Sequence, residues 1–361
     1  MSDEEKLSLI RKRIDSIDEQ IQTLINNRAQ CAQEVAEVKQ SATEDTVFYR
    51  PEREADILRR VQARNLGPLG NEEMARLFRE IISACLAMEQ VLKIAFLGPE
   101  GTFTQAAALK HFGHSVDTVP LSAIDEVFRE VESEAAHYGV VPIENSTEGV
   151  INHTLDMFIN TNLKICGEVE LRIHHHLLST ETELTAIKKV YSHQQSLGQC
   201  REWLDAHLSQ AEYVSVSSNA EAAKMAASEK GCAAIASDTA AEIYALNILE
   251  AKIEDEPDNT TRFLIIGRQD VEPSQKNKTS LLLSTDNKAG ALFSLLNPLV
   301  ENKISMTRIE SRPSHRGMWD YVFFIDIEGH VSDPIVAKAL AQLEKQTALF
   351  KVLGSYPCAV L

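Results

Sequence analysis

The amino-acid sequence predicts a multidomain protein that contains an all-α helical bundle, an α/β domain and a small βαββαβ domain of the ferredoxin-like type. With 361 residues, the chain is too long for one ordinary hydrophobic core. Its first 50 residues contain no glycine and no proline, whereas strand and helix patterns alternate from Lys93 onwards. The net charge is -4 over residues 1–92, -15 over 93–275 and +2 over 276–361. We therefore expect domains at 1–92, 93–270 and 276–361.

The composition limits the classes of partner and the cellular location. The formal net charge is -17, which argues against nucleic acid or an anionic membrane as a partner, because both require clustered Lys and Arg. No apolar run approaches the roughly 20 residues of a membrane span, and the acidic start MSDEEKLSLI does not resemble a signal peptide. The six cysteines form no C-x-x-C pair. We therefore expect reduced thiols, no zinc site and a cytoplasmic protein.

A heptad pattern predicts a long helix in the first block. The apolar positions are Leu7, Ile10, Ile14, Ile17, Ile21, Leu24, Cys31, Val35 and Val38. Arg28 stands on this stripe where an apolar residue is expected, and Lys39 returns to within roughly 20° of the same direction. Arg11 points roughly 100° away from Arg28. The pattern allows Arg28 and Lys39 to share a site, whereas Arg11 more easily reaches a site on a neighbouring helix.

Charged residues on two later helical segments extend this pattern. Arg50, Arg53 and Glu54 lie in the stretch FYRPEREADILRR, and Glu89 interrupts the apolar stripe of the next helix. With the two cations of the first helix, they indicate a small polar cavity inside a helical bundle. Another interpretation stays open, in which the seam arginine only sets the helix register, Lys39 extends to solvent and Glu89 lies at a helix edge.

The helical block resembles the all-α chorismate mutase family in five residues and their spacing: Arg11, Arg28, Lys39, Arg53 and Glu54. The resemblance implies that cations hold the dicarboxylate chorismate in the compact conformer that rearranges to prephenate, without a nucleophile, metal or cofactor. It implies that Arg11 comes from a partner subunit. Glu89 stands where the best-known enteric pattern has a glutamine that donates to the ether oxygen, so it would donate only when protonated. Arg50 stands where that pattern has an aspartate.

Polar loops follow several strands of the predicted α/β domain. Ligands bind at the strand ends of such sheets, although polar loops are also ordinary structure there. The heptapeptide PDNTTRF, residues 257–263, places two hydroxyls beside an arginine ahead of an apolar run, a pattern that is also typical of a plain turn. His174, His175 and His176 lie in a strand pattern whose alternation separates the middle side chain from the others, so we expect no metal site there.

The motifs GPEGT, PIENS, SHQQ and NTTRF, in this order, resemble prephenate dehydratase across the second block. The resemblance implies a two-lobed α/β domain in which prephenate loses its ring hydroxyl and ring carboxylate to become phenylpyruvate. Thr261 would donate a hydrogen bond to the leaving hydroxyl, and Arg262 would anchor a carboxylate. Gln194 departs from the proline usual in the family. The implied substrate-binding residues are Thr102, Glu144, Asn145, Ser146, Ser192, His193, Gln195, Asn259, Arg262 and Phe263.

The third block reads as strand, helix, strand, strand, helix, strand. Its stretches GAL and ESRP resemble the phenylalanine-binding motifs of the ACT domains that are joined to prephenate dehydratases. The resemblance implies a phenylalanine site between two subunits, although Gly290 could also be a plain helix cap and Arg312 a solvated turn residue. The residues implied are Gly290, Ala291, Leu292, Glu310, Ser311, Arg312 and Pro313.

Together the three resemblances imply a bifunctional chorismate mutase/prephenate dehydratase of phenylalanine biosynthesis that is feedback-inhibited by phenylalanine. Its expected partners are the small molecules chorismate and prephenate, phenylalanine as effector, and further copies of itself in a homodimer or a dimer of dimers. We expect no cofactor and no metal. The alternative from another class is a non-catalytic amino-acid sensor, in which the α/β block only binds and the helical block only dimerises.

Overall fold

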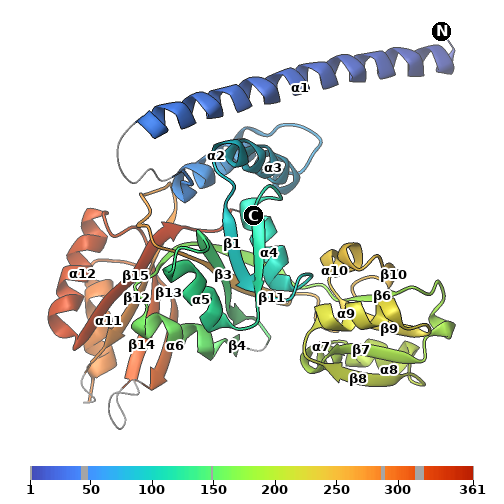
Figure 1. The fold of residues 1–361 in the computed structure, drawn as a ribbon. Coiled ribbons are helices and arrows are strands. Elements are labelled where there is room, and N and C mark those ends of the chain that lie inside the picture. Colours follow the sequence, from blue (N-terminus) through green and yellow to red (C-terminus); the bar gives the residue numbers. More distant parts are fainter. Residues whose placement is uncertain (1, 42–47, 148, 286–288, 314–320, 361) are drawn as a thin grey trace.

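The computed structural model describes residues 2–41, 48–147, 149–285, 289–313 and 321–360. Three helices form the N-terminal part: α1 (Asp3–Ser41), α2 (Pro51–Arg64) and α3 (Asn71–Glu89). The 39 residues of α1 form one uninterrupted helix, as the lack of glycine and proline predicts. Its C-terminal part packs on α3, while its N-terminal half projects away from the rest of the molecule (Figure 1). The apolar stripe of this projecting half is exposed to solvent: Leu7, Ile10, Ile14, Ile17, Ile21 and Leu24.

The α/β domain has two lobes, as predicted. The first lobe is a six-stranded sheet in the order β2-β1-β3-β11-β5, with β4 paired to β3. Its strands and helices are β1 (Lys93–Leu97), α4 (Phe103–Phe112), β2 (Asp117–Leu121), α5 (Ile124–Glu132), β3 (Tyr138–Asn145), β4 (Gly149–Val150), α6 (Asn152–Asn160), β5 (Lys164–Arg172) and β11 (Thr260–Gly267). The returning strand β11 is antiparallel to both β3 and β5. It therefore carries the NTTRF motif into the middle of the first sheet.

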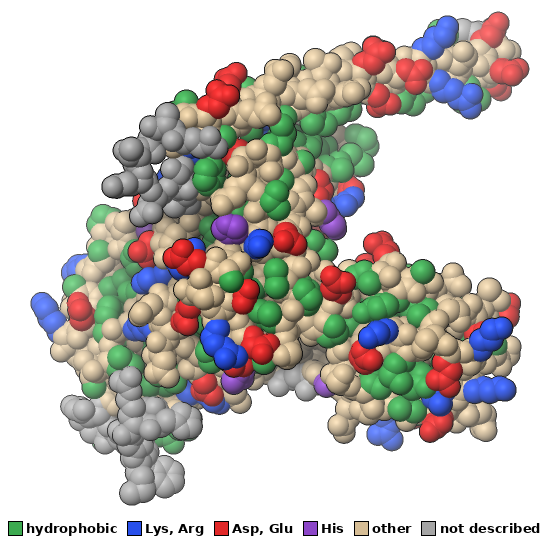
Figure 2. Space-filling view, in the orientation of Figure 1, with side chains coloured by type: hydrophobic (Ala, Val, Ile, Leu, Met, Phe, Trp, Pro, Cys, Tyr) green, Lys and Arg blue, Asp and Glu red, His purple; other side chains and the backbone are tan. Residues whose placement is uncertain are grey.

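The second lobe is a five-stranded sheet in the order β10-β6-β9-β7-β8. Its elements are β6 (His176–Ser179), η1 (Leu184–Ala186), β7 (Lys189–His193), α7 (Gln194–Gln199), α8 (Arg201–His207), β8 (Glu212–Val216), α9 (Asn219–Ser228), β9 (Cys232–Ala236), α10 (Asp238–Ile243) and β10 (Asn247–Glu250). The space-filling view shows this lobe set off from the rest of the molecule by a notch (Figure 2). The connections between the lobes run through residues 173–175 and 251–259.

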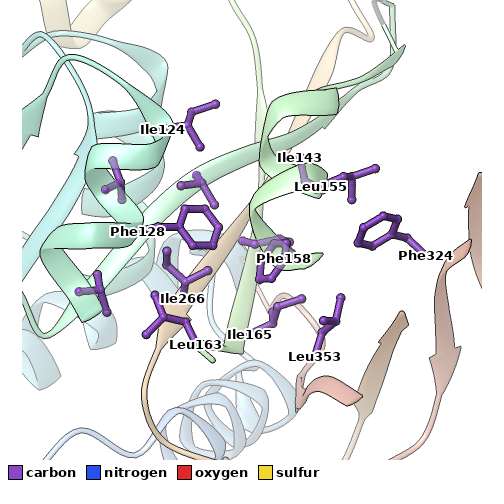
Figure 3. Packing of buried hydrophobic residues seen from close by; sticks show 14 of the residues in the cluster. Ile124, Phe128, Ile143, Leu155, Phe158, Leu163, Ile165, Ile266, Phe324 and Leu353 are labelled. Carbon is purple, nitrogen blue, oxygen red and sulfur yellow. The ribbon is translucent and has the colours of Figure 1, made fainter. Parts of the chain in front are cut away.

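The C-terminal domain confirms the predicted βαββαβ order. It consists of β12 (Asn277–Ser284), α11 (Ala291–Glu301), β13 (Met306–Pro313), β14 (Tyr321–Glu328), α12 (Pro334–Gln346) and β15 (Leu349–Pro357), with the sheet order β13-β14-β12-β15. Alternate residues of its strands bury opposite faces: Leu281 and Ile325 pack under the two helices, whereas Leu282 and Phe324 pack against the first lobe. This second face shares one hydrophobic core with Ile143, Leu155, Phe158 and Ile165 of the first lobe (Figure 3).

All six cysteines are free thiols, and four of them are buried. In the described part of the chain no helix is long and apolar enough to cross a membrane. Nor does any group of three or more His, Cys, Asp and Glu side chains there have an arrangement that could hold a metal ion. The three consecutive histidines do not share one strand, contrary to the sequence prediction: His174 and His175 lie in the connection between the lobes, and only His176 begins β6.

Candidate functional sites

A cavity of about 510 Å³ lies between the three N-terminal helices. Arg28 and Lys39 reach it from α1, Arg53 and Glu54 from α2, and Glu89 from α3. The structure thus brings together the charged residues that interrupt the apolar stripes. Arg28 and Lys39 point in a common direction because residues eleven positions apart return to the same side of α1. Arg50 also lines this cavity.

Glu89 faces Lys39 across the cavity, with 3.7 Å between Glu89 Oε2 and Lys39 Nζ. The Glu89 side chain is only 10% exposed, so it does not point to solvent from a helix edge. Its Oε2 atom is buried and has no hydrogen-bond partner among the described residues. A carboxyl group in this position can take part in a hydrogen bond with a bound molecule.

The Glu54 carboxylate accepts a hydrogen bond from a buried residue that the sequence analysis missed. Arg79 on α3 is buried and donates from Nη1 to Glu54 Oε1. Behind this pair, the hydroxyl of Tyr49 lies 3.0 Å from Nε2 of His111, which belongs to α4 of the first lobe. Burial raises the pKa of Tyr49 and lowers the pKa of His111 well below its ordinary value, so both rings are neutral near pH 7. Arg79 lies three positions before Ile82, on the buried face of α3. A charged residue at this spacing from an apolar one is the signal that could have identified it.

Arg11 lies outside the cavity. It is exposed on the projecting half of α1, and its 17-residue separation from Arg28 corresponds to roughly 25 Å along the helix at 1.5 Å per residue. Within one chain Arg11 therefore cannot reach the cavity to which Arg28 contributes.

A second cavity, of about 380 Å³, lies between the two lobes of the α/β domain. Residues from all four predicted motifs line it: Thr102, Asn145, His193, Gln195, Asn259, Thr261 and Phe263. The sequence analysis missed Ser218 and Asn219, the N-cap and first residue of α9, which also line this cavity. They occupy the same strand-to-helix position as the predicted motifs, so the same signal could have found them.

The hydrogen bonds around Thr261 fix which atoms donate. Asn145 Nδ2 donates to Thr261 Oγ1 and to Asn259 Oδ1, both at 2.8 Å. The backbone N–H of Thr147 donates to Asn145 Oδ1 at 3.0 Å, which sets the orientation of the Asn145 amide. Because the Thr261 oxygen is the acceptor from Asn145, its own hydrogen remains to be donated to another group. Thr261 is only 8% exposed.

Several other predicted residues support the walls of this cavity. Thr102 caps α4, since its hydroxyl accepts from Gln105 N and donates to Leu97 O. Ser192 is buried and donates to Asn219 Oδ1 at 2.9 Å. Ser146 Oγ accepts from Thr260 N at 2.9 Å. Neither Ser146 nor Ser192 is among the residues that line the cavity.

Arg262 requires a correction. Successive residues of a strand point to opposite faces, and Arg262 points away from the cavity that Thr261 and Phe263 line. Its guanidinium donates to Glu168 at 2.8 Å, to Asp326 at 2.7 Å and to the hydroxyl of Tyr356 at 3.1 Å. Burial alone would lower the pKa of Arg262, but Tyr356 and the two carboxylates raise it. The structure thus does not place Arg262 as a carboxylate anchor in this cavity.

Glu144 is displaced from the cavity in the same way. It lies outside the lining residues and accepts from Arg308 Nε of the C-terminal domain at 2.8 Å. The sequence motif placed Glu144 and Asn145 together, but strand alternation directs only Asn145 into the cavity.

The predicted effector residues lie at one end of the C-terminal domain. Gly290 caps α11 with φ 78°, a left-handed conformation that glycine adopts without strain. Glu310, Ser311, Arg312 and Pro313 lie on β13, the edge strand of the sheet. Arg312 donates to both carboxylate oxygens of Asp156 on α6 at 2.8 Å, so it is not a solvated turn residue. Large apolar side chains are exposed on these same elements: Leu292, Phe293, Val300, Met306 and Ile309.

Comparisons with known proteins cover all three parts of the chain. Family models described as chorismate mutase type II, prephenate dehydratase and ACT domain match residues 10–90, 94–271 and 279–345 respectively. Bifunctional chorismate mutase/prephenate dehydratases from Stutzerimonas stutzeri and Pseudomonas aeruginosa are 60% and 58% identical, with the full length of each chain covered. The enzyme of the same name from Escherichia coli is 33% identical over 99% of this chain and 97% of its own.

Solved structures agree with these matches. The prephenate dehydratase of Arthrobacter aurescens in complex with L-Phe has a TM-score of 0.68 and 34% identity, covering 74% of this chain and 90% of that one. The prephenate dehydratase of Staphylococcus aureus has a TM-score of 0.65 and 31% identity, covering 73% of this chain and all of that one.

Proposed function

Because the chain belongs to the family of bifunctional chorismate mutase/prephenate dehydratases, we propose that it rearranges chorismate to prephenate between its N-terminal helices and converts prephenate to phenylpyruvate between its α/β lobes. The observation that carries this proposal is the presence of two separate cavities, each lined by several residues of one family motif set.

In the helical cavity, Arg28, Lys39 and Arg53 hold the carboxylates of chorismate so that the compact conformer is favoured. The rearrangement is pericyclic and needs no covalent catalyst, so positioning and charge stabilisation supply the rate. Glu89 donates a hydrogen bond to the breaking ether oxygen when its carboxyl group is protonated. The buried Arg79 keeps Glu54 oriented toward the cavity.

In the cavity between the lobes, Thr261 donates its hydrogen bond to the departing ring hydroxyl. The prephenate dianion gives the phenylpyruvate anion, CO₂ and hydroxide, and formation of the aromatic ring drives the step. The ring C–O bond breaks with its electron pair on oxygen, and the C–C bond to the carboxylate supplies the pair that completes the ring. Thr261 acts as a preorganised donor, since Asn145 holds its oxygen.

We also propose that two copies of the chain complete the helical site. The face of α1 that packs on α3 near Arg28 continues into solvent as the exposed apolar stripe. An exposed apolar seam of this length is typical of an unpaired helix. A second copy packed along it would bring its own Arg11 to the cavity, giving a homodimer or a dimer of dimers.

Phenylalanine is the proposed effector, because the Arthrobacter relative was solved in complex with L-Phe. The exposed apolar residues around α11 and β13 support a site at an interface between two C-terminal domains. Calorimetric titration should show binding of phenylalanine, and a turnover assay should show inhibition of the dehydratase. Binding without inhibition would contradict a regulatory role.

The free thiols support a cytoplasmic location.

The purified chain tests the enzymatic assignment directly. Incubation with chorismate should yield phenylpyruvate, with prephenate as an intermediate that can also be supplied on its own. Turnover at neither step, with phenylalanine still bound, would instead support the non-catalytic sensor.

A further inference from the structure

Two neighbouring strands of the first lobe present residues alternately to the catalytic cavity and to the C-terminal domain. Thr261 on β11 is the register partner of Asn145 on β3, and Arg262 is the register partner of Glu144. The first pair lines the cavity and shares a hydrogen bond. The second pair points to the opposite face of the sheet and forms ion pairs with the C-terminal domain. Phe324 and Leu353 of that domain pack against the first lobe (Figure 3).

The C-terminal domain offers a matching pair of opposite charges. Arg308 on β13 and Asp326 on β14 are register partners. Arg308 Nε lies 2.8 Å from Glu144 Oε2, and Arg262 Nη1 lies 2.7 Å from Asp326 Oδ2. The Glu144–Arg262 pair of the first lobe therefore faces the Arg308–Asp326 pair of the C-terminal domain with opposite charges. Only one orientation of the two sheets forms both ion pairs. We refer to Glu144, Arg262, Arg308 and Asp326 as the charge clasp.

Three side chains of the clasp are largely shielded from water. The exposed fraction is 11% for Arg262, 12% for Arg308 and 6% for Asp326, against 40% for Glu144. Ion pairs between shielded groups are screened little by salt, and removal of one partner leaves an uncompensated charge. Burial would raise the pKa of Asp326, but Arg262 and the Ser280 hydroxyl lower it, so Asp326 is ionised. The clasp therefore resists small displacements of either strand.

We propose that Arg308 and Asp326 are positioning residues for the dehydratase reaction, acting through Glu144 and Arg262 on the Asn145–Thr261 pair. Neither residue touches the cavity that holds Thr261. Arg308 contacts Glu144, the neighbour of Asn145 in sequence, and Asp326 contacts Arg262, the neighbour of Thr261. Adjacent residues of a strand are about 3.3 Å apart. A shift of β13 and β14 thus displaces the donor geometry at Thr261. This inference rests on the proposed dehydratase activity.

The clasp also identifies the contact through which the state of the C-terminal domain alters catalysis. A ligand of that domain changes turnover only if the two states of the domain differ in the geometry they impose on the active site. The strand that carries Arg308 also carries the predicted effector residues Glu310 and Arg312. Displacement of β13 by an effector would therefore reach Glu144 directly.

The Arg308→Gln variant of the full chain tests this proposal. We expect dehydratase kcat to fall at least tenfold, KM for prephenate to stay within twofold, and mutase kcat to be unchanged. Arg308→Lys, which keeps a positive charge beside Glu144, should retain most of the wild-type kcat. An ion pair that only held the two domains together would not lower kcat while leaving KM unchanged.

Lys351→Met is the matched control. Lys351 also belongs to the C-terminal domain and donates across the same interface, to the backbone oxygens of Phe158 and Thr161, neither of which lies on β3 or β11. Its dehydratase kcat should stay within twofold of wild type. Equal effects of Arg308→Gln and Lys351→Met, or an equal loss of kcat in Arg308→Gln and Arg308→Lys, would overturn the positioning role while leaving the wild-type activity intact. A wild-type chain without dehydratase turnover would overturn the proposed function and this inference together.

Discussion

The two cavities achieve selectivity for anionic substrates in opposite ways. The helical cavity gathers cations from α1 and from the start of α2, and α1 extends far beyond the chain's own core with its apolar stripe exposed. The cavity between the lobes is lined by hydroxyl, amide and imidazole side chains that come from one chain. Under our proposal, the mutase site depends on the assembly of two chains, whereas the dehydratase site depends on the geometry of two strands within one chain.

The largest expected effect comes from Thr261→Val, which keeps the shape of the side chain and removes the donor. Loss of one preorganised donor costs about 10²–10³ in kcat, so dehydratase turnover should fall by that factor while mutase turnover is spared. Steady-state assays with prephenate and with chorismate measure the two separately. An unchanged dehydratase rate would remove Thr261 from the mechanism, and loss of both activities would indicate misfolding.

The second largest effect is expected from variants that disturb the pairing of two chains along α1 but leave the cavity between the lobes unchanged. In an Ile14→Glu, Ile21→Glu variant, two charges stand on the exposed stripe of α1, where they prevent a second helix from packing. Mutase kcat/KM should fall at least tenfold and dehydratase kcat should change less than twofold. A Thr23→Glu, Asn26→Glu variant places the same charges on the opposite face of α1 and should keep both activities. Equal losses of mutase activity in the two variants would contradict a role for the stripe.

The third effect sharpens the chemistry of the helical cavity. A carboxylic acid at Glu89 donates only while protonated, whereas an amide always donates. Glu89→Gln should therefore keep mutase kcat within about threefold of wild type or raise it, whereas Glu89→Leu, which removes the group that donates, should lower it. Equal mutase rates in the two variants would exclude Glu89 as the ether-oxygen donor.

The smallest effect concerns the contact between the helical part and the first lobe. The pKa of buried His111 lies well below its ordinary value, so below about pH 6.5 the unfolded chain binds a proton that the folded chain does not. Stability should therefore be lost as pH falls below that value, by at most about 1.4 kcal/mol per pH unit. Denaturant unfolding of His111→Gln should show a shallower loss over this range. The same slope in both proteins would show that another group controls it.

The sequence predicted the fold and the charged residues that line the helical cavity for a physical reason. Helical period alone brings Arg28 and Lys39 together, and the three domains follow from the change in apolar pattern at Lys93 and after residue 276. A motif, however, does not say which of its side chains faces the substrate. Arg262 and Glu144 stand in the right motifs on the wrong face of their strands, and the domain that they contact is distant in sequence. Arg79 was missed because its partner Glu54 lies on another helix.

Complementation between two inactive variants tests whether two chains share one helical site. Arg11→Ala and Arg28→Ala chains should each have little mutase activity as pure proteins. When they are co-expressed and pair at random, about half of the dimers are mixed, and one of the two sites in each mixed dimer holds both native arginines. If two chains share each site, the mixture should recover about one quarter of wild-type mutase activity, with dehydratase activity normal throughout. A mixture no more active than the average of the two pure variants would contradict it.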